Sequence, residues 1–279
     1  MPATSHFFQN RSMLPLHFLQ WGRPGATPVV LLHGLRAYAQ TWEPLAESLV
    51  DDFCCYALDQ RGRGLSAWAD SHTYRTEHYV HDLEDLVEYL HLGRFMLVGH
   101  SLGGANALEY ARLHPGRLSA LVIEDIGPGS SSSGDGAARI RREMQDTPLH
   151  FPDWESAREF WRRARPGLSA DGIASRLTHS MKATDEGVTW RHDQRGIAEA
   201  RLTITPTDLW PAVRALDCPT LFIRGGRSDF LPLETLVALE SANANIQTTA
   251  IADASHYVHD DQSVIFNEVV GSYLRAQRS

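Results

Sequence analysis

Short apolar runs, separated by helical patterns, limit the folds open to this sequence more than any other feature. Each run is almost continuously apolar, which is typical of parallel strands covered on both faces. Residues 76–90 instead carry apolar residues at spacings of three and four, which predicts an amphipathic helix, and 101–113 and 264–274 are similar. The runs are 28–32, 53–59, 94–99, 118–125 and 219–225, with a further strand expected at 246–251. Strands alternating with helices predict an α/β fold with a mostly parallel sheet flanked by helices.

This alternation stops between Gly127 and about Thr207. A flexible stretch, GPGSSSSGDG, comes first, and helical segments rich in aromatic residues and arginine follow it, with no strong strand before Pro219. Such a shift in composition indicates an inserted region. We interpret residues 128–207 as a helical cap over the sheet, and residues 1–127 with 208–279 as the core.

Charge and cysteine content argue against several classes of protein. The 279-residue chain has a formal net charge of -8, which argues against nucleic acid or an anionic membrane surface as the main partner. Its three cysteines, Cys54, Cys55 and Cys218, include an adjacent pair and show no disulfide or metal-site spacing. We therefore expect reduced thiols and a cytoplasmic protein.

The sequence also predicts no export signal and no membrane span. Its first ten residues, MPATSHFFQN, lack the basic start and apolar stretch of a signal peptide. No apolar run approaches the roughly 18 residues that a membrane span requires. We expect a monomer or homodimer that acts on a small molecule.

Residues 99–103, Gly-His-Ser-Leu-Gly, lie between a predicted strand and a predicted helix. In this G-x-S-x-G pattern the small glycines permit a strained turn that lifts the hydroxyl of Ser101 clear of the backbone. The start of the following helix favours negative charge nearby. A simple glycine–serine turn is the plainer alternative, but the strand before it and the helix after it are the context of a nucleophile. We predict that Ser101 is one.

Four motifs in order resemble the α/β-hydrolase superfamily over essentially the whole chain. They are HGL at 33–35, DQRGRGLS at 59–66, the serine turn at 99–103 and SHY at 255–257. The resemblance implies the α/β-hydrolase fold, a reaction without cofactor, and a structural role for 59–66. No cluster of Cys, His and Asp has metal-site spacing in the sequence, so we also expect no metal. Haloalkane dehalogenases and epoxide hydrolases carry Asp at the position of Ser101, which excludes them.

The resemblance also assigns the partners of the serine. The base comes late in the chain in this fold, which indicates His256. The backbone N–H groups of Leu35 and Leu102 are the expected oxyanion hole. His259, three residues beyond the base, is expected at the surface.

The acid of the triad has two candidates. Most relatives place the acid after the penultimate strand, in the pattern G-x-x-D-x-x-x-P. Here residues 225–232 read GGRSDFLP. Ser228 therefore occupies the position of the acid in this pattern, and Asp229 follows one residue later. Asp125 ends the strand after the serine helix, within the sequence EDIGP. A group of small bacterial esterases and amide hydrolases takes its acid from that strand. We favour Asp125, with Asp229 as the second choice.

Aromatic residues and arginines of the cap are candidate substrate contacts. Trp161 and Trp190 could wall a pocket, and Arg142 could bind a carboxylate of the substrate. The plainer interpretation for most cap arginines is a solvated surface, because acidic residues nearly balance them.

Together these features predict a serine hydrolase that cleaves a small carboxylic ester through an acyl intermediate on Ser101. An amide or lactone hydrolase and a carbon–carbon-bond hydrolase of ring-cleavage products remain open within the same fold. A hydrolase-fold receptor with little turnover is the alternative from another class, although a receptor need not keep a complete serine, histidine and acid set.

Overall fold

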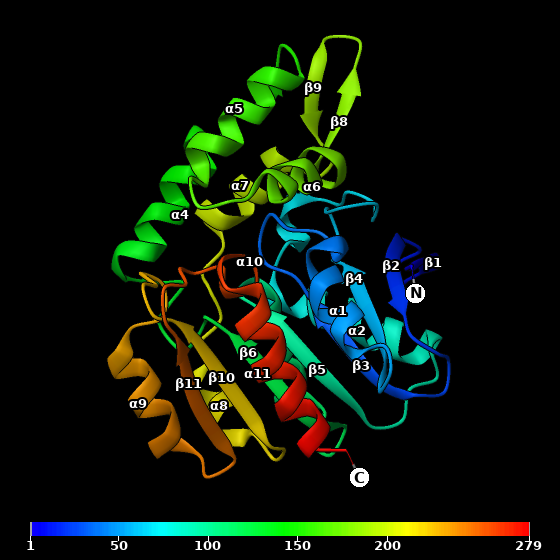
Figure 1. Cartoon of the computed structure of the whole chain (residues 1–279), viewed down its shortest axis with the longest axis vertical. Coiled ribbons are helices and arrows are strands. Elements are labelled where there is room, and N and C mark those ends of the chain that lie inside the picture. Colours follow the sequence, from blue (N-terminus) through cyan, green and yellow to red (C-terminus); the bar gives the residue numbers. More distant parts are fainter. Residues whose placement is uncertain (1, 279) are drawn as a thin grey trace.

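An eight-stranded sheet lies at the centre of the molecule (Figure 1). In the computed structural model, which describes residues 2–278, the strands run in the order β1-β2-β4-β3-β5-β6-β10-β11. From β4 to β11 every pair of neighbours is parallel, as predicted. The strands are β1 (Thr4–Gln9), β2 (Pro15–Trp21), β3 (Thr27–Leu32), β4 (Phe53–Asp59), β5 (Phe95–His100), β6 (Leu118–Glu124), β10 (Thr220–Gly225) and β11 (Ile246–Ile251).

Helices cover both faces of this sheet, because its central strands are apolar on both sides. Alternate residues of a strand point to opposite faces, so Val29 and Leu31 of β3 join one apolar cluster and Val30 and Leu32 join the other. Helices α1 and α11 complete the first cluster, and α2, α3, α8 and α9 complete the second. The core helices are α1 (Glu43–Leu49), α2 (Thr76–Tyr89), α3 (Leu102–Leu113), α8 (Trp210–Ala215), α9 (Leu233–Ala242), α10 (Val258–Asp261) and α11 (Ser263–Ala276), with short 3-10 turns at Ala39–Trp42 and Ser71–Thr73. The predicted fold class is confirmed.

Strands β1 and β2 form an antiparallel hairpin at one edge of the sheet, which the sequence analysis did not predict. Polar residues interrupt both strands, so neither shows the continuous apolar run of the central strands. One of these polar residues, His17, is buried because its Nδ1 lies 2.7 Å from Oδ2 of Asp59.

The inserted region is not purely helical, which corrects the predicted helical cap. It contains a small antiparallel sheet of order β7-β9-β8 beside its helices, and both lie at the top of Figure 1. Its strands are only two to four residues long, too short to stand out as apolar runs. The elements are α4 (Gly134–Asp146), β7 (His150–Phe151), α5 (Trp154–Ala164), α6 (Ala170–Ser180), β8 (Met181–Thr184), β9 (Gly187–Trp190) and α7 (Gln194–Thr203). We keep the name cap for residues 128–207, whose bounds stay a prediction.

Two further features of the chain bear on the expectations above. All three cysteines are buried and free. Between residues 2 and 278, no helix combines the length and apolar character needed to cross a membrane.

Candidate active site

Ser101 occupies a tight turn between β5 and α3. Its backbone has φ 51° and ψ -115°, a conformation that is strained for a residue with a side chain. The flanking glycines permit it: a Cβ on Gly99 would lie 2.5 Å from the carbonyl oxygen of Gly103, and one on Gly103 would collide with that of Leu32. The turn therefore fixes the serine hydroxyl at the end of the strand.

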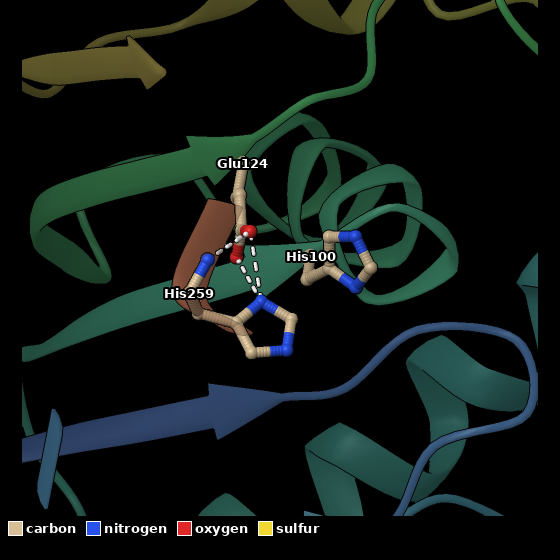
Figure 2. Close-up of side chains that lie close together, drawn as sticks. All are labelled: His100, Glu124 and His259. Carbon is tan, nitrogen blue, oxygen red and sulfur yellow. Dashed lines mark hydrogen bonds and ion pairs between the residues drawn. The ribbon is translucent and has the colours of Figure 1, made fainter. Parts of the chain in front are cut away.

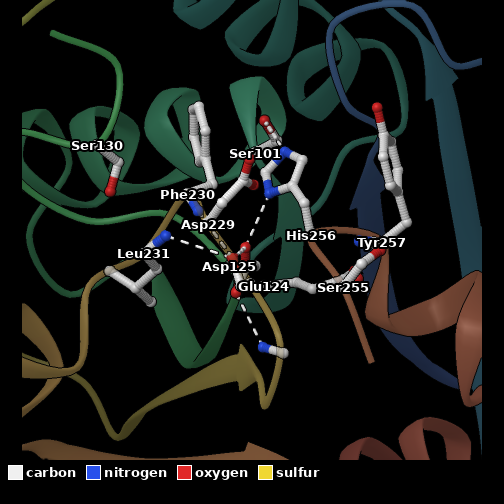
Figure 3. Close-up of polar contacts among 12 residues, drawn as sticks. Ser101, Glu124, Asp125, Ser130, Asp229, Phe230, Leu231, Ser255, His256 and Tyr257 are labelled. Atoms are coloured by element: carbon white, nitrogen blue, oxygen red, sulfur yellow. Dashed lines mark hydrogen bonds and ion pairs between the residues drawn. The ribbon is translucent and has the colours of Figure 1, made fainter. Parts of the chain in front are cut away.

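His256 bridges Ser101 and Asp125 (Figure 3). Its Nε2 lies 3.0 Å from Oγ of Ser101, and its Nδ1 lies 2.8 Å from Oδ2 of Asp125. Because a carboxylate only accepts hydrogen bonds, Nδ1 carries the hydrogen, and Nε2 of the neutral ring can then accept the serine proton. All three side chains are buried. The structure thus brings the three residues together in the geometry of an activated nucleophile.

Asp125 is held from two strands. It follows β6 in a left-handed backbone conformation, with φ 51°. Its Oδ1 accepts a hydrogen bond from the backbone N–H of Gly225 at 2.9 Å, and its Oδ2 accepts one from the hydroxyl of Ser228 at 2.5 Å. These donors orient the carboxylate toward the ring of His256.

The structure does not bring Asp229, the second candidate acid, to the ring. Its two carboxylate oxygens accept hydrogen bonds from the guanidinium of Arg139, at 2.8 and 2.9 Å, which holds the pKa of Asp229 below its ordinary value. The next residue, Phe230, packs on His256 instead, with ring centres 4.3 Å apart. Asp229 thus joins the core to the cap.

Leu35 and Leu102 both line a cavity with Ser101. Neither backbone N–H donates to another group within residues 2–278, as an oxyanion hole requires. The Leu35 loop is fixed from two sides: Nε of Arg63 donates to the carbonyl of Leu35 at 3.0 Å, and a Cβ on Gly34 would lie 2.6 Å from His100.

The cavity has a volume of about 930 Å³ and lies between the core and the cap. Trp161 and Arg142, two of the predicted substrate contacts, line it. Trp190 does not. It is buried in the apolar cluster of the cap, and its Nε1 donates to the carbonyl of Pro148 at 2.7 Å. Trp190 is therefore a packing residue of the cap, which corrects the expectation that it contacts substrate.

His259 is buried beside the site, which corrects the prediction of a surface residue. With His100 and Glu124 it offers possible metal ligands within 4.8 Å of one another (Figure 2). Most of these atoms already have a partner, and among them Nδ1 of His100 is unpartnered within residues 2–278. Nδ1 of His259 lies 2.8 and 2.9 Å from the two oxygens of Glu124, and Nε2 of His100 donates to a backbone carbonyl. We interpret the cluster as a buried hydrogen-bonded ion pair.

Comparison with known proteins identifies the family. A sequence model described as the alpha/beta hydrolase fold matches residues 27–263. The chain belongs to the α/β-hydrolase fold family. It is 27% identical, over 98% of both chains, to 2-(acetamidomethylene)succinate hydrolase from Mesorhizobium japonicum. It is 28% identical to Esterase Rv0045c from Mycobacterium tuberculosis, over 92% of this chain and 85% of the esterase.

The solved structures agree with this assignment. The crystal structure of E-2-(acetamidomethylene)succinate hydrolase superposes with a TM-score of 0.88 at 24% identity, covering 98% of this chain and all of the other. With the family match and the two relatives above, the protein is an enzyme, a hydrolase of this fold.

Several residues of this α/β-hydrolase site did not stand out in the sequence as functional. The sequence placed Ser228 at the expected position of the acid. Its contact with Asp125, however, arises because β10 and β6 are neighbours in the sheet. His100 and Glu124 each precede a predicted site residue, and their side chains lie against the loop of His256. No local pattern signals such contacts, because they join residues more than 100 positions apart.

Proposed function

We propose that this enzyme hydrolyses small carboxylic esters through an acyl intermediate on Ser101. The continuous hydrogen-bond chain from Ser101 through His256 to Asp125, at the wall of a large cavity, is the observation that carries the proposal.

In the first half of the reaction, Oγ of Ser101 attacks the carbonyl carbon while its proton passes to Nε2 of His256. The N–H groups of Leu35 and Leu102 stabilise the negative oxygen of the tetrahedral intermediate. The carbon–oxygen bond to the alcohol then breaks, and His256 returns the proton to the leaving oxygen.

In the second half, water attacks the acyl group and gives a proton to His256. The intermediate collapses to the free acid, and Ser101 regains its proton from the imidazolium. Asp125 keeps the ring oriented and stabilises its positive charge in both halves.

The cavity wall favours a substrate that itself carries a carboxylate. Among residues 2–278, nine arginines and six acidic residues line the cavity, whereas the whole chain has a formal net charge of -8. A cationic cavity in an anionic protein concentrates anions at the site. Arg142 lines the cavity, is exposed, and has no hydrogen-bond or acidic partner within residues 2–278. We propose that it contacts such a carboxylate and that Trp161 contacts apolar parts of the substrate.

An amide is the second candidate for the bond that is cleaved. The relative from Mesorhizobium japonicum is named for a succinate that bears an acetamido group, and the similarity spans 98% of this chain. A serine, histidine and aspartate set can cleave either bond, because His256 can protonate a leaving nitrogen as well as a leaving oxygen. A cytoplasmic location and a monomeric or homodimeric state are further parts of the proposal.

Two esters of matched length test the substrate class. We expect mono-p-nitrophenyl succinate to be hydrolysed with a kcat/KM roughly tenfold or more above that of p-nitrophenyl butyrate, the effect of one charge-assisted hydrogen bond. Arg142→Gln should remove most of this preference. Arg163→Gln is the control, because this arginine is 74% exposed on α5 and does not line the cavity. Equal rates on the two esters would contradict the carboxylate preference, and no turnover of any ester or amide would favour a receptor.

A further inference from the structure

Side chains from two strands hold the loop that carries His256. Nε2 of His100 donates to the carbonyl oxygen of His256 at 2.9 Å. The carboxylate of Glu124 accepts from the backbone N–H of His259 at 3.0 Å and from Nδ1 of the same residue at 2.8 Å (Figure 2). The loop is thus tied to the sheet both at His256 and three residues beyond it.

These two anchors are chain neighbours of the other members of the candidate triad. His100 directly precedes Ser101, and Glu124 directly precedes Asp125. The backbone N–H of Ser101 also donates to the carbonyl of Glu124 at 3.0 Å. A displacement of the His256 loop would therefore have to break contacts with the strand ends that carry the nucleophile and the acid.

The charge states suit these contacts. Burial, aided by the neighbouring rings of His256 and His259, holds the pKa of His100 well below its ordinary value, so His100 is neutral. Its Nδ1 has no partner within residues 2–278, so the ring hydrogen lies on Nε2, where it is donated. Burial disfavours a charged His259, but the carboxylates of Glu124 and Asp260 outweigh it and raise its pKa.

The same loop also contacts the cap. Asp260 lies 3.9 Å from Nε2 of His259 and forms an ion pair with Arg176 of α6. The guanidinium of Arg165 lies 3.6 Å from the ring centre of Tyr257 and 3.3 Å from a carboxylate oxygen of Asp261. Every residue of this bridge is less than one fifth exposed, apart from partly buried Tyr257.

We propose that Glu124, His259 and His100 are positioning residues that fix His256 between Ser101 and Asp125, and that Arg176 extends this support to the cap through Asp260. The inference rests on the proposed function, because it assigns His256 as the base. A shift of about 1 Å in a reacting group can cost roughly 10²-fold in rate, so the support of this loop bears directly on turnover.

Two variants of His259 separate positioning from packing. His259→Leu removes the side-chain donor to Glu124 and leaves the backbone N–H donor in place. We expect kcat to fall roughly 10- to 100-fold with KM changed less than about twofold. His259→Asn keeps an N–H donor close to the position of Nδ1 and should recover most of the loss. If Leu at this position prevents folding, Glu124→Gln weakens the same pair in an otherwise native shape and should lower kcat in the same direction.

The chain offers a matched control in another histidine–glutamate pair. His114 lies 2.8 Å from Glu84 at the surface, and neither lines the cavity. His114→Leu should leave kcat unchanged.

A serine-directed phosphonate separates failure of this inference from failure of the proposed function. Its rate of addition to Ser101 should fall in His259→Leu together with kcat. Wild-type rates of labelling and turnover in folded His259→Leu would overturn the positioning role. Absence of labelling of the wild type at Ser101 would instead overturn the proposed function.

Discussion

Ser228 donates its hydroxyl hydrogen to Oδ2 of Asp125 over 2.5 Å, and the same oxygen faces Nδ1 of His256 at 2.8 Å. Ser228 follows β10 and Asp125 follows β6, and these strands are neighbours in the sheet. Ser228, which stands where the family resemblance places the usual acid, thus supports an acid from the adjacent strand. Ser228 and His256 thus share one oxygen of Asp125.

Neutralising each candidate acid distinguishes them. Asp125→Asn should lower kcat by about 10⁴, the scale observed when a triad acid is neutralised in a well-studied protease. Asp229→Asn should lower kcat by about tenfold or less. It removes only the ion pair with Arg139, in which the side chain of Asp229 is 36% exposed, and such pairs contribute little stability. Both are measured on one ester at neutral pH. A crippled Asp229→Asn beside a nearly native Asp125→Asn would reverse the assignment.

Because Ser228 contacts Asp125, we expect that substitution can transfer the role of the acid to residue 228. The double variant Asp125→Asn with Ser228→Asp places a carboxylate at residue 228. In the native protein, the side chain of this residue already contacts the carboxylate of Asp125. We expect the double variant to recover at least about tenfold of the activity lost in Asp125→Asn alone, because a carboxylate is again available to stabilise the imidazolium. Asp125→Asn with Ser228→Asn is the matched control without the charge. Equal activities of these two double variants would show that position 228 cannot serve the ring.

The charge of His259 makes part of the stability depend on pH. Burial opposes the charge, and the carboxylates of Glu124 and Asp260 outweigh burial and the repulsion of Arg176, so the folded-state pKa lies above 6.5. Neutral His100 adds no charge. A raised pKa stabilises the fold fully below the unfolded-state pKa, and the contribution is lost as the pH rises through the folded-state pKa.

Urea unfolding of the wild type and His259→Asn at a series of pH values measures this contribution. The difference in free energy of unfolding should be largest below pH 6.5 and should shrink as the pH is raised above it. A difference that grows with pH would contradict the charged pair.

Sequence patterns within a few residues were enough to predict the central strands, the turn at Ser101 and two candidates for the acid. The apolar runs of β3 to β6 are buried on both faces wherever they sit in the sheet. Ser101 could be predicted because only small neighbours tolerate its turn. The acid could be narrowed to two residues, since carboxylates at the ends of two adjacent strands both fit the chemistry.

The burial of His259, the place of Trp190 and the hairpin of β1 and β2 could not be predicted, because each depends on residues distant in sequence. His259 is buried because Glu124, 135 residues earlier, accepts two of its hydrogens. Trp190 lies away from the cavity because it packs with Phe151 and Trp161 inside the cap. The strands β1 and β2 are stabilised by each other and by β4 rather than by an apolar run of their own.

Phosphonate labelling of Ser101 tests the central claim most directly. Ser101→Ala should fold like the wild type, since it removes one oxygen, while turnover of esters falls on the order of 10⁶-fold. A serine-directed phosphonate should add once to the wild type, at the peptide that contains Ser101, and should not add to Ser101→Ala. Labelling of Ser101→Ala at the wild-type rate, or ester turnover that survives the substitution, would contradict the assignment of Ser101 as the nucleophile.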